Sequence, residues 1–317
     1  MLAREYISGL ASEGATLVVV PGTDDTGARN LGRWLSWFFA LFARVVIIDY
    51  PGTVGPIVGG WKADRYDTSR DKAVDATVRT VSMTAGKVVI IGYSQGAEAA
   101  WLAAARLHQL GLKPDTDIEL VVWAHPRHPT GFKASLEQNH PVASWVLRRF
   151  FGAETNGAAD ESATGTIRVT SIAITGDPVT ALEVWYKNPL GFVCNSLAGF
   201  FMIHAGLGQY GAARVGGLSI WGAWKAPDSC TTHVAINSAH PVTQLLRWRR
   251  YVPGVLVQNI IATLAPVSLP GQRSASIFAV RRNWRTAGRL ILAEVTPLPA
   301  QPKEKRQAAE VILAPAS

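Results

Sequence analysis

The chain has 317 residues, of which 48% are apolar and 17% charged. This length and composition exclude a globally disordered chain and favour one large domain with an appendage. The formal net charge of +8 and the pI near 9.7 favour contact with anionic surfaces, without choosing between nucleic acid, lipid headgroups and an acidic polymer.

Strand and helix patterns alternate along the first 175 residues. Continuously apolar runs predict buried strands at 15–20, 44–49, 87–92, 119–123 and 166–175. Helical spacing of apolar residues predicts helices at 30–42, 67–83 and 95–110, and a terminal helix that begins at Pro241. This alternation predicts an α/β fold with a mostly parallel central sheet and helices on both faces. In such sheets the chemistry lies at the carboxyl ends of the strands.

The second half of the chain predicts a different organisation. We expect a catalytic domain over 1–253, in which an insertion at about 178–230 forms a lid or an acyl-chain groove. An extension over 254–317 follows, and its proline- and lysine-rich end is typical of a partly flexible segment.

Membrane and targeting signals are weak. Segment 1–16 carries acidic residues and lacks the apolar stretch of a secretory signal, so we expect none. Segment 31–50 is interrupted by two arginines, and segment 189–208 contains His204 and several glycines, so we expect no transmembrane helix. The two cysteines, Cys194 and Cys230, leave both a single disulfide bridge and two reduced thiols open.

The most informative motif is Gly92-Tyr93-Ser94-Gln95-Gly96, which is Gly-x-Ser-x-Gly between a predicted strand and a predicted helix. A serine hydroxyl is a poor nucleophile, so it must be lifted clear of the sheet and placed beside a base. The strained strand-to-helix turn of an α/β-hydrolase does this, and its glycines avoid collisions with neighbouring backbone. We predict Ser94 as the nucleophile of a serine esterase that needs no metal or other cofactor.

The fold requires an acid and then a histidine after the nucleophile. Asp177 follows the fifth predicted strand in a Gly-Asp-Pro loop, where the orienting acid belongs. Competing acids are Asp160 and Glu161, which lie in a polar loop with no strand before them, and Glu183, which falls on a predicted helix. We predict Asp177 as the acid.

Seven histidines occur, and four of them precede Asp177 and so fit the chain order badly. Among the other three, His204 lies in an apolar stretch that is typical of a buried histidine with satisfied hydrogen bonds. His240 stands at the start of the terminal helix. His233 lies in a predicted loop ahead of that helix, so we predict His233 as the base, with His240 as the alternative.

The oxyanion hole is expected to use the backbone N–H of Gln95, the residue after the nucleophile. A second donor is expected from the loop after the first strand, Pro21-Gly22-Thr23-Asp24. We predict Thr23, because its hydroxyl adds a further donor.

Together these segments resemble a known family. The chain is similar to mycobacteriophage lysin B. The segments that carry this resemblance are GYSQGA after an apolar strand, the upstream VVPGT and DYPG, WAHPRHPTGF after the fourth strand, the GDP that contains Asp177, and a late histidine before HPVTQLLRW. That family is related to cutinases and to the mycobacterial PE-PPE serine hydrolase domain. The resemblance covers roughly residues 15–251.

The resemblance implies a cutinase-like fold and a phage-encoded enzyme that cleaves mycolic-acid esters of mycolyl-arabinogalactan in the mycobacterial cell envelope. It also implies Ser94, Asp177 and His233 as the triad. The implied partner is a lipid ester, with no nucleic acid. The implied localisation is synthesis in the host cytoplasm followed by action on the envelope after release, or carriage on the virion.

The sequence also departs from that family. Pro21-Gly22-Thr23 stands where the family often has His-Gly-Thr, and no N-terminal peptidoglycan-binding module is visible. The extension beyond about Tyr251 has no counterpart. An alternative is therefore a structural tail or capsid protein on the same hydrolase fold, with the extension contacting other virion proteins.

Overall fold

The computed structural model describes residues 3–182, 184–187, 189–205, 210, 218, 220–226, 229–249, 255–265 and 310–314. Within these residues the chain forms one eight-stranded sheet of order β6-β7-β5-β4-β3-β1-β2-β8. All neighbouring strands pair in parallel, except that β6 and β7 are antiparallel. This is the mostly parallel α/β sheet that the sequence predicts.

The five predicted strands form within a residue or two of their expected bounds. They are β1 (Thr16–Val20), β2 (Arg44–Ile48), β3 (Val88–Tyr93), β4 (Ile118–Trp123) and β5 (Arg168–Ile174). Their β-branched residues suit a pleated surface, and both faces of the central strands are buried.

Successive strand residues enter two separate cores, because side chains alternate across a sheet. On one face, Val18, Val20 and Ile90 pack against α4 (Tyr66–Met83) and α5 (Gln95–Leu110). Small buried alanines on α5 let this helix lie close to β3 and β4.

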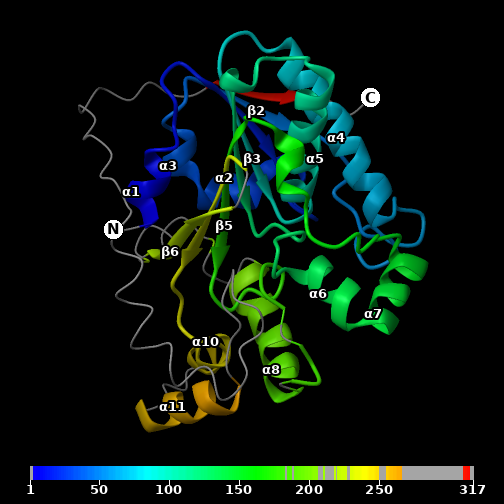
Figure 1. The fold of residues 1–317 in the computed structure, drawn as a ribbon, viewed down its shortest axis with the longest axis vertical. Helices are drawn as coiled ribbons and strands as arrows, with labels where there is room; N and C mark the ends of the chain where they lie inside the picture. Colours follow the sequence, from blue (N-terminus) through cyan, green and yellow to red (C-terminus); the bar gives the residue numbers. More distant parts are fainter. Residues whose placement is uncertain are drawn as a thin grey trace.

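On the other face, Val19 and Ile91 join a cluster with residues of α1 (Ala3–Ser8), α2 (Arg29–Trp34) and α3 (Ser36–Phe39). Figure 1 shows α4 and α5 on the side of the sheet opposite to α1, α2 and α3. The predicted helix at 30–42 is thus two short helices, because Leu35 leaves helical geometry at φ −112°.

The remaining helices gather at one end of the molecule (Figure 1). They are α6 (Phe132–Asn139), α7 (Pro141–Val146), α8 (Pro189–Gly199), α10 (Pro241–Trp248) and α11 (Val255–Leu264). Single turns of π-helix continue α7 as η3 (Leu147–Phe151) and α8 as η5 (Phe200–His204). Short 3-10 turns lie at Thr26–Ala28 (η1), Asp115–Asp117 (η2) and Glu161–Thr164 (η4). None of the described helices is both long and apolar enough to cross a bilayer.

Three strands lie where the sequence predicts none. β6 (Ile220–Lys225) and β7 (Thr231–Ile236) extend the sheet beyond β5, and β8 (Glu310–Ala314) pairs with β2 at the other edge. The predicted insertion therefore contributes α8, η5 and β6 to the fold, and the predicted extension contributes α11 and β8. Residues 266–309 of that extension lie outside the described part of the chain.

Candidate active site

The turn between β3 and α5 holds Ser94 in a strained conformation. Its φ of 55° and ψ of −119° lie where L-residues are rarely found. A Cβ at Gly96 would lie 2.1 Å from the carbonyl oxygen of Pro21, and one at Gly92 would lie 2.4 Å from that of Gly96. Both glycines of the motif are thus required by backbone contact, and the turn is a nucleophile elbow.

Ser94, His204 and Asp177 form a hydrogen-bonded chain. The Oγ of Ser94 lies 2.9 Å from Nε2 of His204, and Nδ1 of His204 lies 3.2 Å from Oδ2 of Asp177. Because a carboxylate only accepts, Nδ1 carries the proton, and Nε2 is left to accept from the serine hydroxyl. The geometry matches the serine–base–acid arrangement of acyl-transfer enzymes.

The loop after β5 fixes the Asp177 carboxylate, which is fully buried. Its Oδ1 accepts the backbone N–H of Val179 at 2.9 Å. Its Oδ2 accepts the hydroxyl of Tyr210 at 2.8 Å, in addition to His204. Asp177 is therefore where the sequence predicts it, at the carboxyl end of β5.

His204 comes from the π-helical turn η5 that ends α8. Its ring stacks between Tyr93, with ring centroids 5.4 Å apart, and Phe200, at 5.3 Å. The hydroxyl of Tyr93 also donates to the main-chain carbonyl of His204. These contacts hold the imidazole in one orientation between the serine and the aspartate.

Close backbone contact brings this helix to the Asp177 loop. A Cβ at Gly199 would lie 2.2 Å from the carbonyl oxygen of Gly176, and Gly176 itself has φ +87°. Two glycines thus allow α8 to approach the loop closely enough for His204 to reach the carboxylate.

Both predicted oxyanion residues lie at the elbow, Gln95 directly after Ser94 and Thr23 in hydrogen-bond contact with Gln95. Gln95 begins α5, whose first N–H groups have no intrahelical partner. The predicted loop after β1 also touches the elbow, because a Cβ at Gly22 would lie 3.5 Å from Cβ of Ser94. The hydroxyl of Thr23 donates to the side-chain oxygen of Gln95 at 3.3 Å, so in this structure the hydroxyl proton is engaged by Gln95.

The structure places His233 away from Ser94, so the predicted pairing is not the one that forms. His233 is the third residue of β7, in register with Ser171, and its Nε2 bonds Glu161 at 2.5 Å. The segment forms a strand because Thr231–Ile236 is rich in β-branched residues. Strands β5 and β4 separate β7 from β3, so His233 lies roughly 14 Å across the sheet from the strand that leads into the elbow.

The alternatives also have other partners. Nε2 of His240 bonds the carbonyl oxygen of Ala265 at 2.7 Å. Asp160 caps the turn η4 by accepting the N–H of Ser162, and Glu161 is occupied by His233. The competing acid Glu183 lies outside the described residues.

The apolar neighbours of His204 in the sequence predict a buried structural histidine. The side chain is indeed buried, at 5% exposure, yet its partners are a serine and an aspartate. Chain order admits His204, which follows Asp177 by 27 residues, but it admits His233 and His240 equally. Apolar surroundings do not distinguish a buried structural histidine from a buried base.

A charged cluster lies under the elbow helix. Glu98 on α5 bonds Lys133 at 2.7 Å, and it also bonds Arg70 at 3.1 Å and the hydroxyl of Tyr66 at 2.8 Å. Burial opposes ionisation of Glu98, but the two cations outweigh it and lower its pKa to about 2. The side-chain amide of Gln95 is linked to this cluster, because it donates to the carbonyl oxygen of Tyr66 at 3.0 Å.

Both cysteines are free thiols in the structure, Cys194 on α8 and Cys230 just before β7. The residues that the structure describes contain no group of three or more side chains able to hold a metal ion.

The sheet, the elbow and the helices on both faces define an α/β-hydrolase. A family model described as the PE-PPE domain matches residues 43–267. The chain therefore belongs to the PE-PPE domain family, whose members have a lipase-like α/β-hydrolase fold. No curated protein matches the chain.

Solved structures offer more remote likenesses. The type II thioesterase BorB from the borrelidin biosynthetic cluster is 15% identical, with 82% of this chain and 94% of that chain covered and a TM-score of 0.35. The RedJ thioesterase from the prodiginine pathway of Streptomyces coelicolor is 14% identical over 80% and 88%, with a TM-score of 0.32. The Bacillus licheniformis lipase BlEst2 is 14% identical over 70% and 83%, at a TM-score of 0.25.

Proposed function

We propose that this chain is a serine esterase of lipid esters, with Ser94 as nucleophile, His204 as base and Asp177 as the orienting acid. The observation that carries the proposal is the 2.9 Å contact between Oγ of Ser94 and Nε2 of His204 at a strained elbow. Strain of this kind persists only where surrounding structure imposes it, and it clusters at functional sites. Membership of a lipase-like family supports ester hydrolysis in general.

In the proposed reaction, His204 takes the proton of Ser94 as Oγ attacks the ester carbonyl carbon. The oxyanion is held by the backbone N–H of Gln95 and by the backbone N–H of Thr23. The tetrahedral intermediate collapses, His204 protonates the departing alcohol oxygen, and an acyl-enzyme on Ser94 remains. Water then attacks with His204 as base, which releases the acid and restores the serine.

The assay is hydrolysis of p-nitrophenyl butyrate by the purified chain beside Ser94→Ala. We expect turnover that the variant loses by at least about 10³-fold, because the covalent step is gone. A fluorophosphonate probe should label the parent chain and leave the variant unlabelled. Equal background hydrolysis from both proteins would contradict the proposal and favour the structural virion alternative.

A lipid substrate is supported by the surface beside the site. Exposed large apolar side chains are concentrated on the helices at the site's end of the molecule, and those on α8 and η5 are Leu190, Val193, Leu197, Phe200 and Phe201. The residues that α8 buries are instead small or polar, such as Gly191 and Ala198. An apolar row facing outward beside a nucleophile suits acyl chains.

The lipid preference is tested by replacing two of these residues, Val193→Gln with Leu197→Gln. We expect the ratio of palmitate-ester to butyrate-ester hydrolysis to fall about tenfold, because apolar contact area for long chains is lost. Met83→Gln, an exposed apolar residue at the end of α4, is the matched control and should keep the ratio. An unchanged ratio in the double variant would contradict a lipid-contacting role for α8.

Within lipid esters, we propose mycolic-acid esters of the mycobacterial envelope as the native substrate, reached after release from the cytoplasm in which the chain is made. The support is the lysin B resemblance of the sequence together with a net charge of +8, which favours an anionic envelope. Release of free mycolic acid from purified mycolyl-arabinogalactan, lost in Ser94→Ala, is the expected result. Turnover of simple esters without such release would overturn this substrate and keep the esterase.

A further inference from the structure

Tyr210 is a buried phenol whose hydroxyl reaches the acid of the proposed triad. Its hydroxyl lies 2.8 Å from Oδ2 of Asp177, and the side chain is 2% exposed. Oδ2 is also the oxygen that accepts Nδ1–H of His204. The phenol and the imidazole thus share one carboxylate oxygen.

The direction of this hydrogen bond follows from a second contact. The backbone N–H of Ile174 donates to the phenol oxygen at 3.1 Å. An amide N–H only donates and a carboxylate only accepts, so the phenol proton is directed to Asp177. Burial first, and then the charge of Asp177, raise the pKa of Tyr210 well above its usual value, so the phenol keeps its proton.

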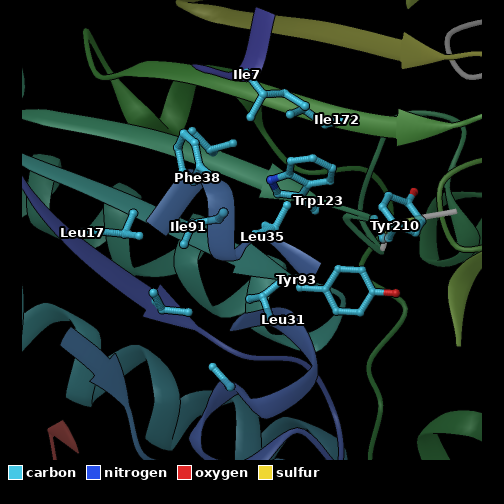
Figure 2. Close-up of a cluster of buried hydrophobic side chains, with 14 of the residues drawn as sticks. Ile7, Leu17, Leu31, Leu35, Phe38, Ile91, Tyr93, Trp123, Ile172 and Tyr210 are labelled. Carbon is cyan, nitrogen blue, oxygen red and sulfur yellow. The ribbon is translucent and has the colours of Figure 1, made fainter. Parts of the chain in front are cut away.

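The ring of Tyr210 is held as firmly as its hydroxyl. It packs edge-on against Tyr93 at 5.5 Å and against Trp123 at 6.0 Å between ring centroids. Figure 2 shows Tyr93, Trp123 and Tyr210 together at one end of the buried cluster. The hydroxyl position is therefore set by the same core that carries the elbow strand.

We infer that Tyr210 is a positioning residue that orients Asp177 and moderates its charge toward His204. With Val179 N–H on Oδ1 and Tyr210 on Oδ2, the carboxylate cannot rotate away from the imidazole. A donor on Oδ2 also draws off negative charge that would otherwise act on His204. This inference rests on the proposed triad and adds a fourth member to it.

The test is Tyr210→Phe, which keeps the ring and removes the donor. We expect kcat on p-nitrophenyl butyrate to fall about tenfold with KM unchanged, because a buried side chain misplaces the base without touching substrate. The acid limb of the kcat/KM profile should move up by about 0.5 to 1 pH unit, because an unshared carboxylate favours imidazolium. The low-field NMR resonance of the His204 Nδ1 proton should move further downfield.

Tyr93→Phe is the matched control, because it also removes a buried phenol hydroxyl from this cluster. That hydroxyl donates to the main-chain carbonyl of His204 and not to the carboxylate, so the acid limb should stay in place. A shift of equal size in both variants, or a loss of kcat in Tyr210→Phe with neither the limb nor the resonance moved, would overturn the inference.

The NMR measurement separates this inference from the proposed function. An inactive parent chain whose Nδ1 resonance still moves in Tyr210→Phe would remove the esterase and keep the positioning role. The opposite outcome is a parent chain that is active, loses its activity in Ser94→Ala, and keeps both its activity and its Nδ1 resonance in Tyr210→Phe. That outcome would keep the esterase and overturn the positioning role. Should Tyr210→Phe not fold, 3-fluorotyrosine at position 210 strengthens the donor and should move the resonance in the opposite direction.

Discussion

Two histidine–carboxylate pairs with a buried imidazole lie among the described residues, and they are alike in most local respects. His204 bonds Asp177 and stacks on Tyr93 with ring planes 20° apart. His233 bonds Glu161 and stacks on Trp224 with ring planes 18° apart. Both imidazoles are buried, at 5% and 3% exposure. Burial, a carboxylate and an aromatic neighbour therefore do not by themselves define a site.

The pairs differ at the second ring nitrogen. Nε2 of His204 meets the hydroxyl of Ser94, whereas Nδ1 of His233 is buried without a hydrogen-bond partner among the described residues. Position in the sheet explains the difference. Ser94 follows the last residue of β3, where the chain can turn out of the sheet, and His233 lies inside β7. At the carboxyl edge of the sheet, the turn after β3 places a serine hydroxyl beside the imidazole of His204, and Nδ1 of His233 has no such hydroxyl beside it in the part of the chain that the structure describes.

The largest expected difference between the two histidine–carboxylate pairs is in the effect of removing the histidine on turnover. His204→Ala should lower kcat on p-nitrophenyl butyrate by about 10⁴ to 10⁶-fold, because no base remains for the serine proton. His233→Ala should change kcat less than about threefold and should instead lower the unfolding midpoint, because Glu161 loses its partner.

Steady-state kinetics and thermal unfolding of the two variants check this contrast. The comparison would break if His233→Ala abolished turnover while the protein stayed folded.

A smaller contrast is expected at the carboxylates. Asp177→Asn should lower kcat by about 10³ to 10⁴-fold, because an amide no longer fixes the tautomer or stabilises imidazolium. Glu161→Gln keeps the shape of the second pair and should leave kcat within about twofold. Burst kinetics on the same ester would locate the Asp177 effect in acylation. A large loss from Glu161→Gln would tie the second pair to the chemistry.

The smallest expected effect is on the pH dependence of stability, through His125, a buried histidine near the second pair. Burial, as the largest cause, lowers the pKa of His125 to about 3, against 6.5 for an exposed histidine. The folded chain thus binds fewer protons than the unfolded chain below pH 6.5. Stability is fully present above that value and is lost as pH falls toward 3, by about 1 kcal/mol per pH unit for this group.

His125→Phe removes that titration and keeps a ring against Trp101, which stacks on His125 with centroids 5.3 Å apart. Urea unfolding between pH 6.5 and 5 should therefore show a shallower loss of stability than in the parent chain. Parallel pH dependences would show that His125 takes up a proton in the folded state after all.

Much of the fold was predictable because its signals are local. Strands β1 to β5 are short apolar runs, and the elbow is a five-residue motif between a strand pattern and a helix pattern. Contacts within the turn require Gly92, whereas the carbonyl oxygen of Pro21 requires Gly96. Ser94 and Asp177 follow from this pattern, since each lies just after a predicted strand. Strand β6 is not predicted because the sequence before it is glycine-rich, and β7 is not predicted because the residues around it resemble a polar loop ahead of the terminal helix.

The sequence by itself determined strands β1 to β5, the nucleophile turn and the loop that carries the acid, because the signal for each lies in residues that are neighbours along the chain. Only the tertiary structure decided the histidine and its supports. His204 reaches Asp177 because Gly199 of α8 packs on Gly176, which is 23 residues earlier in the chain. Tyr210, which bonds the same aspartate, lies still later in the sequence. Such contacts depend on how helices dock on a finished sheet, and no spacing in the sequence records that docking.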